Sequence, residues 1–231
     1  MDESNNRKGR KMKDFKDYIV PKPWGKEYLL FRNGDVAIWI LNINFNEKTS
    51  MHCHPKKNTG LVVMDGSAKV QFLNSSYSLK SLDKIMIFKG HFHSTTCLSK
   101  SGLTLLEIES PEDKNDLVRL NDNYGRANNP YESEDTWLKR TKNEIFIDSV
   151  NKHQQHVLSG CVLKIINNPS KEDLIDKDYN EMFIILKGGL ETSKKEGILS
   201  PGDVVSSQNM TLLVNKFNIS ENTEIMHVIK K

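Results

Sequence analysis

The feature that most constrains the fold is a series of short apolar runs separated by residues that favour turns. Between residues 27 and 110 these runs recur at intervals of about 8–12 residues. Sequences such as Arg32-Asn33-Gly34-Asp35 and Lys100-Ser101-Gly102 stand between them. Val, Ile, Thr and aromatic residues fill the runs, whereas the whole chain contains only three alanines. Because these residue types favour strands over helices, the pattern predicts an all-β fold.

In the first part of the chain we expect strands at Glu27–Phe31, Val36–Phe45, Gly60–Met64, Ala68–Phe72, Ser76–Leu79, Lys84–Phe88, His93–Leu98 and Leu103–Ser110. In the second part we expect them at Glu144–Ser149, Cys161–Ile166, Glu181–Leu186, Gly197–Leu199, Asp203–Ser206, Thr211–Val214 and Glu224–Ile229. Many short strands at such spacing are typical of a β-barrel or of a sandwich such as a jelly roll.

A weak internal repeat suggests that the chain contains two similar barrels. Thr59–Gly66 aligns with Glu181–Gly188, and Leu82-Asp83 aligns with Gly202-Asp203 ahead of the next apolar strand. Asn121–Asp135 is rich in Asn, Gly, Pro and Asp, and is typical of a connection. We therefore predict a flexible basic tail (1–16), a first β unit (17–126), a linker (127–143) and a second β unit (144–231).

Composition excludes several classes of protein. A formal net charge of +3 over 231 residues is too small to indicate nucleic-acid binding. No apolar run approaches the ~18–20 residues of a membrane span, and none follows Met1 as in a signal peptide. Cys53, Cys97 and Cys161 form no CxxC motif. We expect a cytoplasmic protein with free thiols.

Two pairs of histidines give the sharpest chemical signal. His52 and His54 are two residues apart, and so are His91 and His93 further along the chain. Residues i and i+2 of a strand face the same side, so each pair presents two imidazoles to one pocket. Neutral imidazole is a ligand for Zn, Fe, Mn, Co or Ni, and three protein ligands with open positions are usual at catalytic metals.

With these residues the chain resembles the cupin family. His52 and His54 match the His-x-His of the first cupin motif, and Gly66 matches the glycine that closes it. Gly90 and His93 match the centre of the second motif. Across residues 21–126 the resemblance is closer, to the cupin domain of type II phosphomannose isomerases.

The two end motifs carry this closer resemblance. Lys22-Pro23-Trp24-Gly25 is similar to the opening "RPWG" of that domain, and the segment 116–126, which ends in Tyr124-Gly125-Arg126, is similar to its closing motif. The resemblance implies a bicupin of two jelly-roll units. The second unit is degenerate, because no His-x-His precedes Glu181 and no histidine follows Gly202 at the ligand position. It implies a homodimer as well.

The resemblance also implies one divalent transition metal, held by His52, His54 and His93, with His91 as an additional candidate. One position departs from the family pattern, because the cupin glutamate falls on Thr59. The implied function is that of a metal-dependent isomerase or epimerase acting on a small phosphorylated or nucleotide-linked sugar. Two alternatives stay open: a three-histidine iron(II) dioxygenase, and a sugar-binding or regulatory cupin without catalysis.

An anionic sugar needs cationic donors and the isomerisation needs a base. Lys57 and Lys89 flank the histidine motifs, and Arg126 ends the retained closing motif, so these three are the candidates for binding phosphate. Candidates for catalysis are Arg126, Glu107 and Tyr124, since proton transfer between C1 and C2 requires a positioned acid or base. We expect a small-molecule substrate, with no nucleic-acid or membrane partner.

Overall fold

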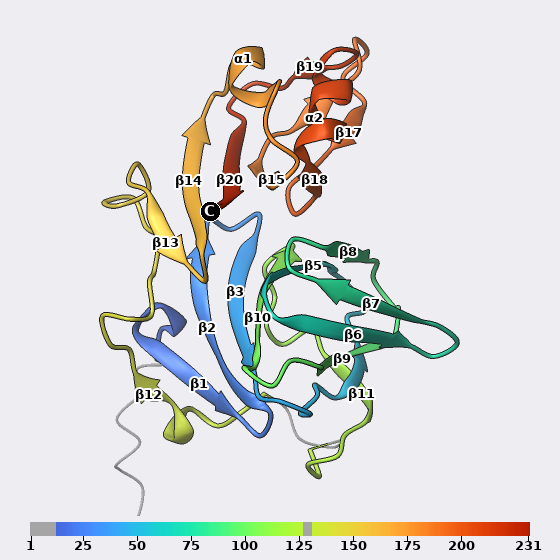
Figure 1. Cartoon of the computed structure of the whole chain (residues 1–231), viewed down its shortest axis with the longest axis vertical. Coiled ribbons are helices and arrows are strands. Elements are labelled where there is room, and N and C mark those ends of the chain that lie inside the picture. The colour runs from blue at the N-terminus through green and yellow to red at the C-terminus, as the bar shows by residue number, and fades with distance from the viewer. Residues whose placement is uncertain (1–12, 127–130) are drawn as a thin grey trace, which may run out of the picture.

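The computed structural model describes residues 13–126 and 131–231, which form two β units, the second above the first in Figure 1. Both are cupin barrels, so the predicted all-β bicupin is confirmed. In the part of the chain that the structure describes, the helices are η1 (Phe15–Asp17), η2 (Glu134–Thr136), α1 (Lys171–Leu174) and α2 (Ser207–Val214). None of these is long and apolar enough to cross a membrane.

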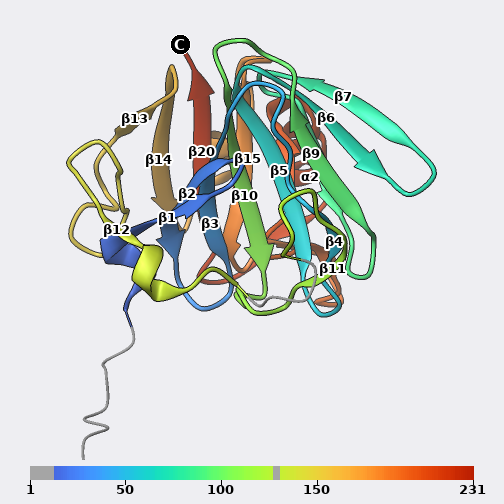
Figure 2. The same cartoon turned by 90° about the horizontal axis from the view of Figure 1, so that it is seen from below.

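The first unit consists of two antiparallel sheets that face each other (Figure 2). The larger sheet has the order β12-β1-β2-β3-β10-β5-β8, and the smaller has the order β11-β4-β9-β6-β7. The strand bounds are β1 Tyr18–Lys22, β2 Gly25–Arg32, β3 Ala37–Ile43, β4 Met51–Cys53, β5 Asn58–Asp65, β6 Ser67–Phe72, β7 Ser76–Lys80, β8 Lys84–Ile87, β9 His93–Cys97, β10 Leu103–Ser110, β11 Val118–Asn121 and β12 Leu138–Lys139. The eight strands expected between residues 27 and 110 are confirmed.

Alternation along the central strands divides the first barrel into an apolar end and a polar end. On β10, Leu103 and Leu105 point into the interior cluster with Trp39, and the same face continues with Glu107 and Glu109. The intervening residues of β10, Leu106 and Ile108, point outward into a second cluster. The strands therefore bury acidic side chains inside one end of the barrel.

The second unit repeats this strand order. Its sheets have the orders β13-β14-β20-β15-β18 and β17-β16-β19, so β14-β20-β15-β18 corresponds to β3-β10-β5-β8. The bounds are β13 His156–Leu158, β14 Cys161–Asn167, β15 Glu181–Lys187, β16 Leu190–Glu191, β17 Gly197–Leu199, β18 Val204–Ser206, β19 Asn218–Ile219 and β20 Glu224–Lys230. A histidine-bearing strand such as β4 has no equivalent among the described residues between β14 and β15, where α1 lies instead.

The turn before β8 and the turn before β18 have the same hydrogen bonds, which confirms the predicted repeat. The Asp83 carboxylate accepts a bond from the Lys80 amide at 2.8 Å, and the Asp203 carboxylate accepts one from the Ser200 amide at 2.8 Å. The amide of Val63 donates to the Asp83 carbonyl, as the amide of Ile185 does to the Asp203 carbonyl.

Two expected strands are wrong. Thr211–Val214 belongs to α2, whose residues Met210 and Val214 are buried one turn apart, and a run as short as four residues does not distinguish a buried helix from a strand. Glu144–Ser149 forms only an isolated bridge, between Ile147 and Phe31. Local side-chain bonds take the place of a ladder there, for example from the Asp148 amide to Asn151 Oδ1 at 2.9 Å.

The predicted tail falls largely outside the described residues, but the chain is packed from residue 13 onward. Phe15 lies with its ring centroid 5.0 Å from that of Trp39 and 4.5 Å from that of Trp137. Trp137, in the predicted linker, is buried, and β12 adds to the larger sheet beside β1. Part of the predicted tail and part of the predicted linker thus pack on the first barrel.

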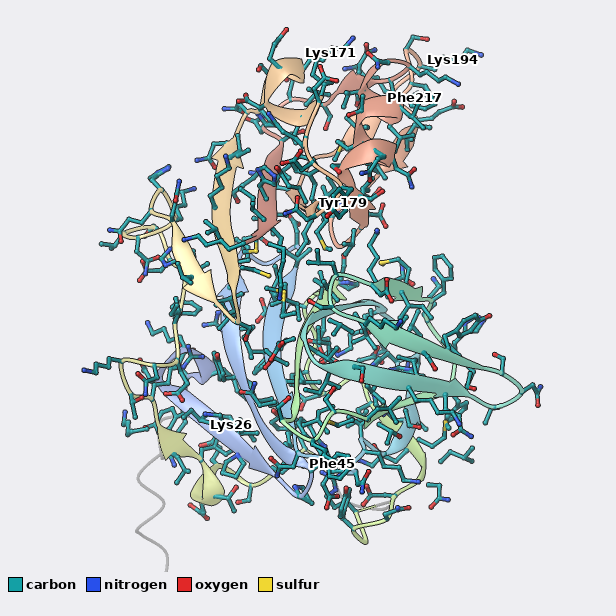
Figure 3. All side chains as sticks on the ribbon, viewed as in Figure 1. Lys26, Phe45, Lys171, Tyr179, Lys194 and Phe217 are labelled. Carbon is teal, nitrogen blue, oxygen red and sulfur yellow. The ribbon has the colours of Figure 1, made fainter. Side chains whose placement is uncertain are left out.

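The outer faces of the two larger sheets pack against each other, and side chains fill the space between the units (Figure 3). Ile38 and Leu106 of the first unit share this cluster with Leu163 and Ile184 of the second. At Gly202 a Cβ atom would lie 2.6 Å from the Cβ of Ser110, so the backbones approach too closely there for a larger residue.

Candidate metal centre

Three of the histidines expected to hold a metal lie together at the polar end of the first barrel. His52 on β4 pairs directly with His93 at the start of β9, and His54 follows β4 on the same side as His52. The ring centroids are 4.4 Å apart for His52 and His93, 5.0 Å for His52 and His54, and 5.5 Å for His54 and His93. One ring nitrogen from each lies within 4.8 Å of the others.

Backbone carbonyls fix the tautomer of all three rings. The Nδ1 atoms of His52, His54 and His93 lie 2.8, 2.6 and 3.0 Å from the carbonyl oxygens of Ser50, Asp116 and His91, respectively. Because a carbonyl only accepts, each Nδ1 carries the proton, and each Nε2 keeps a free lone pair. The Nε2 of His54 is buried and has no hydrogen-bond partner among the described residues.

Electrostatics keeps these imidazoles neutral. Burial lowers the pKa of His52 and His93, and burial together with the nearby Lys57 ammonium lowers the pKa of His54 to about 3. Neutral imidazoles with fixed Nδ1–H groups and free Nε2 lone pairs are the form that ligates a transition metal. The donor set therefore fits one divalent ion.

A cavity with charged walls adjoins His52 and His54. Its charged lining residues are Lys22, Lys57, Lys114, Arg119, Arg126, Glu27, Glu107 and Glu109. The indole of Trp24, from the opening motif, also lines it. A cluster of buried charges with perturbed pKa values beside candidate metal ligands marks this cavity as a candidate functional site.

Lys114 holds three of the carboxylates in this cavity. Its Nζ lies 3.3 Å from Glu27, 3.5 Å from Glu107 and 3.4 Å from Glu109, and 4.0 Å from the ring centroid of Trp39. Burial alone would raise the pKa of Glu27, but Lys114 and Lys22 outweigh it and hold that pKa at about 2. The acidic side chains on β2 and β10 therefore share one buried cation.

The candidates for binding phosphate lie in different places. Lys57 is buried at the cavity, with its Nζ 2.6 Å from Glu109 Oε1 and 2.9 Å from the Asp113 carbonyl oxygen. Arg126 also lines the cavity, and forms ion pairs of 2.7 Å with Asp122 and 2.6 Å with Glu132. Lys89 is exposed and is not among the residues that line the cavity.

The candidates for catalysis and the fourth histidine also lie in different places relative to the cavity. Glu107 lines the cavity, whereas the Tyr124 hydroxyl donates to Glu47 Oε2 at 2.5 Å, away from the cavity wall. His91 is exposed, with its Nδ1 3.2 Å from the Phe88 carbonyl oxygen, and lies outside the three-histidine group. The backbone explains this, since the turn at Gly90 places His91 before the start of β9.

Sequence reasoning missed several residues of this site. Glu27 is a lone acidic residue in the buried run of β2, which is a usable signal for an inward-facing carboxylate. Tyr131, whose hydroxyl donates to Glu27, and Lys22, which pairs with Glu27 at 3.2 Å, depend on that carboxylate. Lys114 stands in a charged loop segment, so only the three-dimensional structure identifies it.

The equivalent end of the second barrel contains different residues. Glu181 lies at the position of Thr59, and its carboxylate accepts a bond from His227 Nε2. The His227 ring stacks on Phe183, with centroids 4.5 Å apart. Deeper in the barrel, Met210 and Val214 of α2 pack with Ile185.

Comparisons with known proteins agree with this fold. Residues 8–122 match the family described as mannose-6-phosphate isomerase C-terminal. No curated protein sequence matches the chain.

Among solved structures, KdgF from Halomonas sp. is similar with 14% identity and a TM-score of 0.40, over 42% of this chain and 87% of that protein. The capsular polysaccharide assembling protein CapF from Staphylococcus aureus shares 18% identity with a TM-score of 0.41, over 45% of this chain and 32% of CapF. An RmlC-like cupin from Shewanella frigidimarina NCIMB 400 shares 18% identity with a TM-score of 0.39, over 42% of this chain and 86% of that protein.

Proposed function

We propose that the protein is a metal-dependent cupin that isomerises or epimerises a small phosphorylated or nucleotide-linked sugar, because residues 8–122 match the family described as mannose-6-phosphate isomerase C-terminal. The observation that carries this proposal is the set of three buried imidazoles, whose Nδ1–H groups are held by carbonyls beside a charged cavity. His52, His54 and His93 would hold one ion of zinc, iron, manganese, cobalt or nickel. A bound divalent ion supplies Lewis acidity toward a sugar carbonyl.

The charges around the cavity support an anionic substrate. The five basic side chains that line it are matched by the carboxylates of Glu27, Glu107 and Glu109 in the wall and of Asp122 and Glu132 behind it. A divalent ion would leave an excess of positive charge, which suits the charge of about −2 on a phosphate group. We propose that Arg126 donates hydrogen bonds to the phosphate of the substrate. A guanidinium has five N–H groups, and the ion pairs of Arg126 use only some of them.

Glu107 is the proposed base. Its side chain points into the cavity from β10, and its nearest cation, the Lys114 ammonium, is 3.5 Å away. A carboxylate held this loosely keeps an oxygen for a proton from the sugar carbon. Glu109, by comparison, is held at 2.6 Å by Lys57.

A solvent-exchange experiment tests the proposal. We expect the metal-loaded protein to incorporate deuterium from D₂O at C2 of mannose 6-phosphate, or at a carbon next to the carbonyl of a nucleotide-linked keto sugar, as followed by NMR. Glu107→Gln should slow this exchange by about 10²–10⁴-fold, the usual contribution of a general base. His153→Ala, which changes an exposed histidine of the second unit, should exchange like wild type. Absence of exchange with every sugar offered would contradict an isomerase.

A specific observation also favours one alternative. Thr59 stands at the cupin carboxylate position, so three neutral histidines form the donor set, as in the three-histidine iron(II) dioxygenase predicted as an alternative above. Uptake of dioxygen by the iron(II)-loaded protein, without exchange at C2, would identify this function. Thermal stabilisation by a sugar phosphate with neither reaction would identify a binding protein.

A further inference from the structure

One cross-strand pair at the cavity contains two buried oxygen atoms, Thr59 Oγ1 and Glu109 Oε2, that have no hydrogen-bond partner among the described residues. Thr59 on β5 lies directly opposite Glu109 on β10. Residues so paired have Cβ atoms about 4.5–5.5 Å apart on the same face, so the Glu109 carboxylate can enter the space that a longer side chain at position 59 would fill. Both residues are at most 1% exposed.

The unsatisfied atoms of this pair face the same barrel end as the histidines. Thr59 Oγ1, Glu109 Oε2 and His54 Nε2 are each buried without a hydrogen-bond partner among the described residues. Burial of such a group is unfavourable, and more so where it is charged, unless an ion or water satisfies it. Glu109, His52 and His54 all line the same cavity.

The second barrel provides an internal comparison. There Glu181 occupies the position of Thr59, and its partner across the sheet is Ile229. In the first barrel the acid stands on the opposite strand and the shorter residue on β5. Each barrel thus has one carboxylate in this cross-strand pair. In the first barrel it lies on β10, and in the second it lies on β15, the strand that corresponds to β5.

We infer that Glu109 on β10 is the fourth ligand of the metal ion held by the three histidines, in place of a glutamate on β5. This inference rests on the proposed metal site. Lys57 holds Glu109 through Oε1 at 2.6 Å, which leaves Oε2 without a hydrogen-bond partner among the described residues. Glu109 lies outside the group of three ring nitrogens that are within 4.8 Å of one another, so its carboxylate would turn toward the ion on binding. Thr59 leaves room for that carboxylate. A protein metal centre of three imidazoles and one carboxylate is thereby restored without a glutamate at position 59.

The test measures metal affinity instead of activity. Zn²⁺ and Co²⁺ are titrated into the full chain against a competing chelator, with stoichiometry from elemental mass spectrometry. Glu109→Gln should weaken binding by at least about 10-fold, the lower range for losing a group that supports a metal site. Glu107→Gln, a change on the same face of the same strand, should weaken it less. The transposed variant Thr59→Glu/Glu109→Gln should regain affinity.

Further variants separate the possible causes. Lys57→Met breaks the same ion pair but keeps the carboxylate, so an equal loss in Lys57→Met would overturn the inference. Wild-type affinity in Glu109→Gln would overturn it too, as would a folded transposed variant that binds as weakly as Glu109→Gln. If His52→Ala loses the ion while Glu109→Gln keeps it, only this inference fails; if wild type binds no ion, the proposed function fails with it.

Discussion

The two barrels have the same strand order but different interiors. In the first, β4 and β9 place imidazoles against the acidic face of β10. In the second, the segment that should carry the first pair of histidines forms α1, and α2 lies between β18 and β19. Topology is thus shared, while the side chains at one end of the barrel decide what each unit can do.

The difference extends to the source of stability. The second interior is filled by apolar side chains such as Phe183, Ile185 and Met210, whereas the first buries charged groups in ion pairs. Buried ion pairs contribute little net stability compared with apolar packing, because desolvation offsets their attraction. The polar end of the first interior therefore adds less net stability than the apolar interior of the second barrel, and we propose that it serves binding instead.

The largest expected effect is on the packing of the second interior. Phe183→Ala should lower the free energy of unfolding by about 3–5 kcal/mol, because it leaves a cavity under β15. His93→Leu in the first interior should destabilise the metal-free protein much less, since it removes a polar group whose burial is already unfavourable. Denaturant titration of both variants checks this, and equal losses would remove the distinction between the two interiors.

A smaller effect is expected from acid. The pKa of His54 is about 3 in the folded protein and about 6.5 when unfolded, so the unfolded chain takes up the proton first as pH falls. Stability is therefore complete above pH 6.5 and declines below it, by about 2 kcal/mol at pH 5 from His54 alone. Thermal melts of the metal-free protein should show a shallower decline for His54→Leu. A decline unchanged from wild type would place the acid sensitivity elsewhere, and His153→Leu is the matched control.

Much of the fold was predictable because turns and alternation are local signals. The repeat of Asp83 and Asp203 was visible because both turns use the same side-chain bond to a backbone amide. The strand expected at Thr211–Val214 is wrong because so short a run is compatible with either a strand or a helix, and burial of Met210 favours the helix.

The residues of the candidate site could be predicted only where their spacing along a strand indicated which side they face. His52 and His54 follow from residues two apart in a strand, and Glu107 follows from the alternation along β10. Lys114 could not be found, because a loop lysine acquires its role only where β2 and β10 bring carboxylates beside it. His91 follows the same spacing rule as His52, but β9 begins only at His93.

The proposed function depends on one metal ion bound by three histidines in the first barrel. Elemental mass spectrometry of protein purified without a metal-affinity step tests it most directly, with His52→Ala and His227→Ala as a pair, one from each barrel. We expect one equivalent of a divalent transition metal in wild type and in His227→Ala, and none in His52→Ala. No metal in wild type after reconstitution, or a full equivalent in His52→Ala, would contradict it.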